Sequence, residues 1–268
     1  MIKINYEVND MIHSVEIDIE EELAIEINKN IQGINESQNK KYKHNNSIKV
    51  FENSSENLSK NTNDTNINIP KNFRKFDINS EKRYEVIKVN NGGFELKESR
   101  NILENACKVA IVLESPHTSE YSDDFQPVGP IKNLSTSTRI KNNINNIIKN
   151  LSNLFIEKNQ FDIYLINPVK FQTSLGSFYE GKLNKKIRDK LWASLYNNVY
   201  KQDFLKEIEE YDIVINCCTH INSESGKKQI TKDLLLQEHR YRVIECNNHP
   251  CVWGKDTEFL VVDNIFKF

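Results

Sequence analysis

Residues 108–114 read KVAIVLE, a nearly unbroken apolar run that predicts a buried β-strand. Three similar runs follow: FDIYLIN at 161–167, DIVINCC at 212–218 and YRVIEC at 241–246. Helical stretches are expected between them, over 138–157, 182–211 and 227–238. Strands that are apolar on both faces and alternate with helices are typical of a parallel sheet covered on both sides. The sequence therefore predicts a three-layer α/β/α domain with a central four-stranded parallel sheet.

Three regions of different composition precede and surround this sheet. Residues 1–29 alternate apolar and polar residues, which predicts a hairpin followed by an acidic strand or helix, a small β-rich N-terminal segment. Residues 30–72 are dominated by Asn, Ser, Lys and Thr without apolar periodicity, and we expect a linker or a mobile insertion there. Residues 73–268 form the α/β domain in this prediction. RYEVIKV and GFEL at its start flank a turn around Asn91 and Gly92, before a short helix expected over 97–106.

The charge distribution and the cysteine content limit the classes of protein to which this chain can belong. The net charge is −2, but the charges are unevenly distributed along the chain. Residues 1–30 contain eight acidic residues and two lysines, whereas residues 130–201 contain twelve basic and four acidic residues. The second stretch suits nucleic-acid binding, although solvated basic helices are also common. Five cysteines without a C-x-x-C pair indicate neither a disulfide framework nor a metal–sulfur site. No apolar run approaches the ~20 residues that span a membrane and no signal peptide is evident, so we expect a cytoplasmic protein.

Each predicted strand of the parallel sheet ends in a polar cluster. Ligands bind beyond the carboxyl ends of such strands, so these clusters are expected to converge on one site. The clusters are Glu114–His117, Asn167–Lys170, Thr219–His220 and Asn247–Pro250. Ordinary structural roles compete with this interpretation: a cap or ion pair for Glu114, backbone hydrogen bonding for Asn167, and a turn for His249. A metal site is disfavoured because none of the histidines has zinc-protease spacing, and we expect no metal and no cofactor.

The order of these motifs resembles the uracil-DNA glycosylase superfamily. VAIVLESPHTSEY (109–121) is similar to the first motif of the family, which reads GQDPYH or GEAPG in different branches. DDFQPVGPI (123–131) follows where the family has a PFVG-like element, and IYLINPVKF (163–171) stands at the TNVVK-like element. NNHPCVW (247–253) matches the histidine–proline motif. The match covers residues 108–254 and is closest to the GEAPG-type pattern, without the iron–sulfur cysteines of that branch.

The resemblance implies a role for each matched position. Glu114 and His249 would be catalytic, and Asn167 would hydrogen-bond the Watson–Crick edge of a flipped base. Ser115, His117, Phe125 and Phe171 would line the base pocket. Lys132, Arg139 and Lys170 would contact DNA phosphates. Val252 and Trp253 stand where the family carries the wedge that fills the vacated stack, with a core position as the alternative for Trp253.

Several positions depart from the family pattern. Ser115 replaces the aspartate of the GQDPYH branch, His117 replaces its tyrosine, and Pro127 replaces the aromatic residue of the PFVG-like element. The base is therefore expected to be uracil or a modified pyrimidine, and the latter would suit a role in phage defence. We expect a monofunctional DNA glycosylase. The alternatives are a non-catalytic sensor of DNA or nucleotides and an α/β enzyme acting on small molecules.

Three roles are open for the acidic N-terminal segment. It would offer a surface to a protein partner, cover the basic groove as a self-inhibitor, or pack on the domain as an accessory unit.

Overall fold

The computed structural model describes residues 2–8, 11–18, 20–45, 66–69, 84–90, 93–95, 106–117, 120–121, 139–140, 142–143, 147, 161–173, 182–218, 226–237, 241–254 and 257–262. The chain divides into two compact units. The first comprises residues 1–73 and 174–190, and the second comprises residues 74–173 and 191–268. Within the described ranges, no helix is both long and apolar enough to cross a bilayer.

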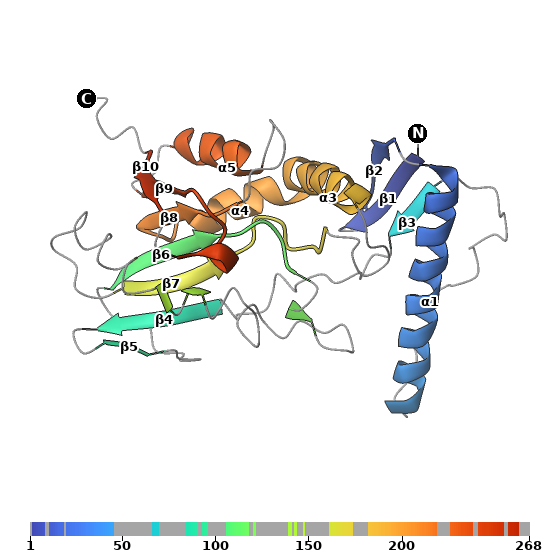
Figure 1. Cartoon of the computed structure of the whole chain (residues 1–268), viewed down its shortest axis with the longest axis horizontal. Coiled ribbons are helices and arrows are strands. Elements are labelled where there is room, and N and C mark those ends of the chain that lie inside the picture. The colour runs from blue at the N-terminus through green and yellow to red at the C-terminus, as the bar shows by residue number, and fades with distance from the viewer. Residues whose placement is uncertain are drawn as a thin grey trace. The chain divides into compact units, whose positions relative to one another are not determined.

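The first unit contains a three-stranded sheet and a long helix. The strands β1 (Ile2–Val8) and β2 (Met11–Ile17) form the predicted hairpin, and β3 (Asn66–Ile69) pairs with β1 in parallel. Helix α1 (Glu21–Asn45) follows the hairpin (Figure 1). Its side chains at Leu23, Ala24, Ile27 and Ile31 are buried, a spacing that places them on one helical face.

The prediction of a linker over residues 30–72 is therefore wrong at both ends. Residues 30–45 continue α1, and residues 66–69 form a strand of the sheet. The Asn-rich composition concealed both elements, because only one face of the helix is apolar and β3 is four residues long. Residues 46–65 and 70–72 lie outside the described residues.

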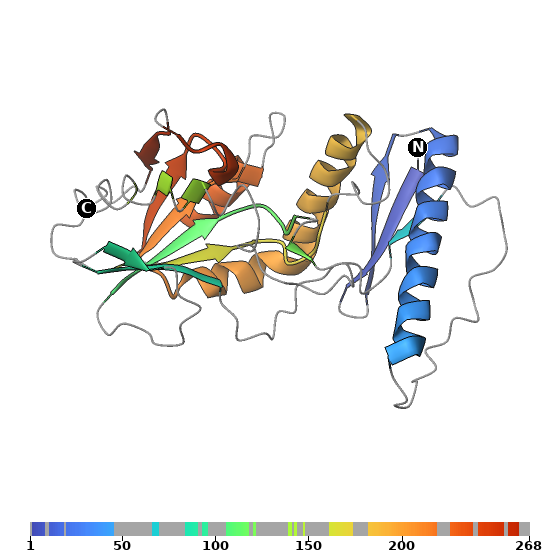
Figure 2. The same cartoon turned by 60° about the horizontal axis from the view of Figure 1, so that its bottom comes forward.

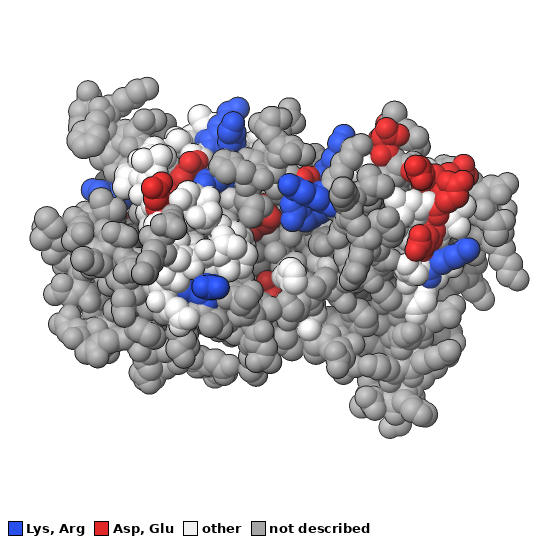
Figure 3. All heavy atoms as spheres, in the orientation of Figure 1, with Lys and Arg blue, Asp and Glu red and all other residues white. Residues whose placement is uncertain are grey.

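Acidic side chains gather on the surface of the first unit, around the start of α1 (Figure 3). The exposed acids are Glu16, Asp18, Glu20, Glu21, Glu22 and Glu26. Glu21 and Glu22 lie in the first helical turn, where negative charge interacts favourably with the helix dipole. The charge asymmetry seen in the sequence is thus displayed on the surface of this unit.

The second unit is built on a seven-stranded sheet with the order β10-β9-β8-β6-β7-β4-β5. Its four central strands are parallel and match the four predicted runs: β6 (Cys107–Val112), β7 (Phe161–Ile166), β8 (Ile213–Asn216) and β9 (Arg242–Cys246). The mixed α/β class and the parallel core are confirmed. The sheet is wider than the four strands predicted, because antiparallel strands extend both edges.

These additional strands come from the ends of the unit. On one edge, β4 (Tyr84–Asn90) runs antiparallel to β7 and forms a hairpin with β5 (Gly93–Glu95). The arrow of β4 points opposite to those of β6 and β7 in Figure 1. On the other edge, β10 (Phe259–Val261) runs antiparallel to β9. The short helix predicted over 97–106 lies outside the described residues except for Ala106, which is not helical.

The two faces of the sheet bury different sets of residues. One face forms an apolar cluster that includes Val109, Ile111, Ile163 and Ile215, and the helical residues Ile140 and Ile147 pack against it. On the opposite face, the Asn216 side chain donates to Lys227 O at 2.9 Å and to Thr231 Oγ1 at 3.0 Å. Both acceptors lie on α5 (Gly226–Leu235), so this helix covers the second face (Figure 2). Described helical residues therefore lie on both faces.

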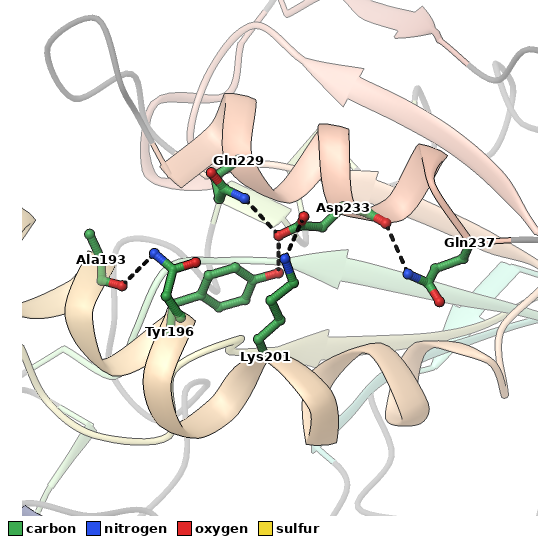
Figure 4. Close-up of polar contacts among 7 residues, drawn as sticks. Ala193, Tyr196, Lys201, Gln229, Asp233 and Gln237 are labelled. Atoms are coloured by element: carbon green, nitrogen blue, oxygen red, sulfur yellow. Dashed lines mark hydrogen bonds and ion pairs between the residues drawn. The ribbon is translucent and has the colours of Figure 1, made fainter.

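The stretch predicted as one helix over 182–211 is interrupted by a π-helical turn. Helix α3 (Lys182–Leu195) continues into the π-helix η2 (Tyr196–Tyr200) and then into α4 (Lys201–Ile208). The wider turn faces α5, whose buried Asp233 receives three side-chain hydrogen bonds (Figure 4). Tyr196 Oη donates at 3.0 Å, Lys201 Nζ at 2.7 Å and Gln229 Nε2 at 2.9 Å. This carboxylate fastens α5 to the preceding helices.

Replacing Asp233 by alanine is expected to lower the free energy of unfolding by about 3 kcal/mol, because the Tyr196 hydroxyl and the Lys201 ammonium lose their partner. Urea unfolding followed by circular dichroism measures this loss. The exposed Asp203 on α4 is the matched control, and Asp203→Ala is expected to cost under about 1 kcal/mol. Equal losses in the two variants would show that the Asp233 network contributes no more than a surface acid.

Candidate site at the carboxyl edge of the sheet

The order of the parallel strands places a topological switch point between β6 and β8. The chain passes from β6 to β7 on one side and from β8 to β9 on the other. Connections that diverge in this way leave a crevice at the carboxyl ends of the two strands, where ligands bind in open α/β sheets. Glu114 follows β6 at this point, and Cys217 and Cys218 follow β8.

The backbone around Glu114 is held from three sides. Trp192 Nε1 donates to Glu114 O at 2.8 Å, and Val169 N donates to the same oxygen at 3.4 Å. Cys218 Sγ donates to Leu113 O at 2.8 Å. Burial, and after it the negative charge of Glu114, raises the pKa of the Cys218 thiol well above its usual range, so it stays a protonated donor. The half-buried Glu114 is thus fixed between the ends of β7 and β8.

A glycine allows this arrangement. A Cβ atom added to Gly226, the first residue of α5, would lie 3.0 Å from Cη2 of Trp192. The indole therefore packs directly on the backbone at the start of α5, and its N–H reaches Glu114 O from there. Trp192 was not identified from the sequence as a site residue, because nothing in its local pattern distinguishes it from an ordinary core residue.

Asn167 follows β7 and carries a buried polar atom without a partner. Its Oδ1 accepts no hydrogen bond from any residue that the structure describes. A buried acceptor left unsatisfied costs roughly 1–3 kcal/mol, and native proteins contain few of them. The predicted structural role for Asn167, satisfying nearby backbone groups, does not account for this oxygen. A ligand that offers an N–H group would satisfy it.

The predicted base-pocket residues have different environments. Ser115 Oγ and Thr173 Oγ1 lie 2.9 Å apart, which fastens the segment after β6 to the segment after β7. His117 is exposed. Phe171 is fully buried at 0% exposure, so the prediction that its ring stacks on a base is wrong: the ring belongs to the core. Phe125 lies outside the described residues.

His249 begins a short 3₁₀ helix, η3 (Pro250–Val252). Its Nδ1 accepts from Cys251 N at 3.2 Å. A neutral imidazole that accepts at Nδ1 carries its proton on Nε2, which makes Nε2 a hydrogen-bond donor. The loop is anchored by Asn247, whose N–H donates to Glu258 O at 3.1 Å, and by the Trp253 indole, which donates to Asn248 O at 3.1 Å.

The two residues of the predicted wedge, Val252 and Trp253, differ in how far their side chains are exposed. Trp253 is 1% exposed and packs edge-on against Phe259 in the apolar cluster, so it is a core residue, and the wedge role is wrong for this side chain. The neighbouring Val252 is 60% exposed. Only Val252 of the pair presents its side chain to an approaching molecule.

The basic stretch of residues 130–201 is partly neutralised within the fold. Lys170 forms an ion pair with Glu207 at 2.8 Å, which occupies the ammonium predicted to contact phosphate. Arg188 pairs with Asp189 at 2.9 Å, and Lys201 pairs with Asp233. Arg139 is exposed, as are Lys185 and Lys190. Lys132 lies outside the described residues.

Two further charged residues near the edge were missed by the sequence analysis. Glu120 is 4% exposed and follows Glu114 on the same loop. Lys227 is 3% exposed, and its Nζ donates to the carbonyl of Cys246, the last residue of β9. Lys227 thereby fixes the strand end that leads to His249. Neither residue stands in a motif, and their burial depends on how loops pack. In the segments that are described, no three His, Cys, Asp or Glu side chains are placed to hold a metal ion.

The contact between Gly226 and Trp192 can be tested by Gly226→Ala. The added methyl group would displace the indole, and we expect the free energy of unfolding to fall by roughly 1–2 kcal/mol. Gly254→Ala is the control, because no atom lies within 4 Å of a Cβ added there. Chemical denaturation of both variants measures the difference. A neutral or stabilising Gly226→Ala would contradict tight packing at this point.

The buried Glu120 carboxyl predicts a pH-dependent stability. Burial, opposed by a hydrogen bond from the His117 N–H, raises the pKa of Glu120 from its usual 4.5 to about 7. The folded state therefore holds this proton more tightly than the unfolded state. The stabilisation is complete below pH 4.5 and is lost as the pH rises to about 7.

Relative to Glu120→Gln, the wild type should lose about 3 kcal/mol of unfolding free energy between pH 4.5 and 7.5. Denaturant titrations at several pH values measure this difference. Glu210→Gln, at an exposed position, controls for a change of net charge. A constant difference between the wild type and Glu120→Gln across this range would show that the carboxyl does not take up a proton on folding.

Comparison of the chain with protein-family models, with curated proteins and with solved structures finds no match.

Proposed function

We propose that the protein is a DNA glycosylase of the uracil-DNA glycosylase type, which hydrolyses the N-glycosidic bond of a flipped base. The observation that carries the proposal is the buried, unpartnered Oδ1 of Asn167 at the carboxyl edge of the sheet. It follows β7, next to the strand end that carries Glu114, and Glu114 O accepts from Val169 N two residues further on. A nucleobase edge offers the N–H donors that this oxygen lacks.

The ends of β6 and β9, which have β8 between them in the sheet, would supply the chemistry. Glu114, as a carboxylate, would orient the attacking water and stabilise positive charge on the sugar as the bond to the base breaks. His249 would donate from Nε2 to a carbonyl oxygen of the base, where negative charge develops, because its Nδ1 is already engaged by Cys251 N. The glycosidic electron pair passes to the base, water adds to C1′, and the base takes up a proton.

Two residues after β6 suit a modified base as well as uracil. Ser115 is bound to Thr173, so the first motif presents a tethered hydroxyl where the GQDPYH branch has an aspartate. The exposed His117 leaves its side of the loop open to solvent, which would accommodate a substituent on the base. A modified pyrimidine, such as those of some phage genomes, is the substrate that we propose alongside uracil.

The proposal is tested by base release from labelled oligonucleotides that contain uracil, hypoxanthine or a modified cytosine. Asn167→Ala and Glu114→Gln are each expected to lower the rate at least 100-fold, because each removes a group that acts in the transition state. Asn142→Ala, at an exposed position on the helical stretch around residues 139–147, is the matched control and should keep the wild-type rate.

Unchanged release by Asn167→Ala and Glu114→Gln would place the chemistry elsewhere on the molecule. No release from any substrate by the wild type, with DNA still bound, would favour the non-catalytic sensor. Cleavage of free nucleosides with DNA ignored would favour the small-molecule enzyme.

A further inference from the structure

A second carboxyl group lies on the loop that leaves β6. Glu120 Oε1 accepts from His117 N at 3.1 Å, and Glu120 N donates to His117 O at 2.9 Å, so the side chain closes a tight turn onto its own loop. The side chain is 4% exposed. Its other oxygen, Oε2, is buried and has no hydrogen-bond partner among the described residues. One oxygen of the carboxyl is therefore held by its own loop, whereas the hydrogen-bonding capacity of the other is unused by the described residues.

The loop of Glu120 is fastened to the segment that carries Asn167. Leu113 N donates to Ile166 O at 2.8 Å, Val169 N donates to Glu114 O, and Ser115 Oγ lies 2.9 Å from Thr173 Oγ1. Three hydrogen bonds thus tie the chain after β6 to the last residue of β7 and to the chain that follows it. Two of the buried oxygens that lack a hydrogen-bond partner among the described residues, Glu120 Oε2 and Asn167 Oδ1, belong to these two tied segments.

The environment of Glu120 favours its neutral form. Burial raises the pKa of Glu120 to about 7, and the His117 N–H opposes that shift only partly. No charged side chain among the described residues contributes to this shift, and the described titratable neighbours along the loop are Glu114, His117 and Tyr121. A protonated carboxyl group has an O–H donor, and a group that titrates near the working pH is suited to general acid catalysis. Two carboxyl groups of one site in unlike environments are typical of an acid and a base.

We propose that Glu120 is the proton donor to the departing base, and that the site therefore acts on cytosine-type bases, which leave poorly as anions. This inference rests on the glycosylase function proposed above and names the substrate class of that site. Uracil forms an anion that its two carbonyl groups stabilise, whereas a cytosine has one carbonyl and leaves more readily once protonated. The exocyclic amino group of a cytosine also supplies the N–H that Asn167 Oδ1 lacks.

The proposed step balances. The C1′–N1 bond breaks and its electron pair passes to the base, while the base takes the proton from Oε2 of Glu120. Water adds to C1′, and its proton passes to the carboxylate of Glu114. The products are the free base and an abasic sugar, and Glu114 then returns its proton through solvent to Glu120.

The test compares release of 5-hydroxymethylcytosine and of uracil from duplex oligonucleotides between pH 5.5 and 8.5. For 5-hydroxymethylcytosine, the wild-type rate should fall with increasing pH above about 7, approaching tenfold per pH unit. Glu120→Gln should be 10²- to 10⁴-fold slower and should lack this pH dependence. Release of uracil should fall less in the same variant. Glu210→Gln should keep the wild-type profile.

Release of 5-hydroxymethylcytosine by Glu120→Gln at the wild-type rate and with the wild-type pH profile would overturn the role of Glu120 and leave the glycosylase function standing. Release of uracil alone by the wild type would overturn the substrate class. No release of any base by the wild type would overturn the glycosylase function itself, and with it the role of Glu120. If Glu120→Gln fails to fold, the pH profile of the wild type alone tests the role of Glu120. A wild-type rate of 5-hydroxymethylcytosine release that does not change between pH 6 and 8 would overturn the proposal.

Discussion

The parallel pairing of β6 with β7 on one side and with β8 on the other constrains the rest of the second unit. Val109, Ala110, Ile111 and Val112 of β6 are all fully buried, because both faces of the strand are covered. Each large apolar side chain removed from water in this way stabilises the fold by roughly 1.5–3 kcal/mol. A shift of register by one residue would exchange the two faces and move the Asn216 amide from the Lys227 carbonyl into the apolar cluster. The register of the strands is therefore fixed. The register in turn fixes how the carboxyl ends of neighbouring strands are aligned.

The central strands could be predicted because their signal is local. Runs such as KVAIVLE are apolar at five consecutive positions, 109–113, which is typical of a strand covered on both faces. The edges of the sheet could not be predicted in the same way. The pairing of β4 with β7 joins residues about eighty positions apart, and no local pattern specifies it. At the N-terminus a local signal existed, since Leu23, Ile27 and Ile31 follow helical spacing, but the Asn-rich composition after them concealed the length of α1.

The position of the candidate site could be predicted from the fold class, whereas the burial and the pairing of its side chains could not. Glu114, Asn167 and His249 stand after strands, so a parallel sheet places them at one edge wherever the helices pack. Whether an aromatic ring faces a base or the core depends on tertiary packing. Trp253 and Phe171 both stand beside the matched motifs, and both are buried in the core. Likewise, nothing near Lys170 in the sequence reveals that Glu207 will reach its ammonium.

The buried carboxyl groups of Asp233 and Glu120 differ in how their oxygens are hydrogen-bonded. Both are almost fully buried, at 3% and 4% exposure. Asp233 receives a lysine, a tyrosine and a glutamine on its two oxygens, which uses its acceptor capacity in holding α5 in place. Among the described residues, Glu120 receives one backbone N–H on one oxygen and has neither a cation nor any partner on the other. The second oxygen of Glu120 makes no hydrogen bond with the described residues, and this is the observation on which its proposed role as proton donor rests.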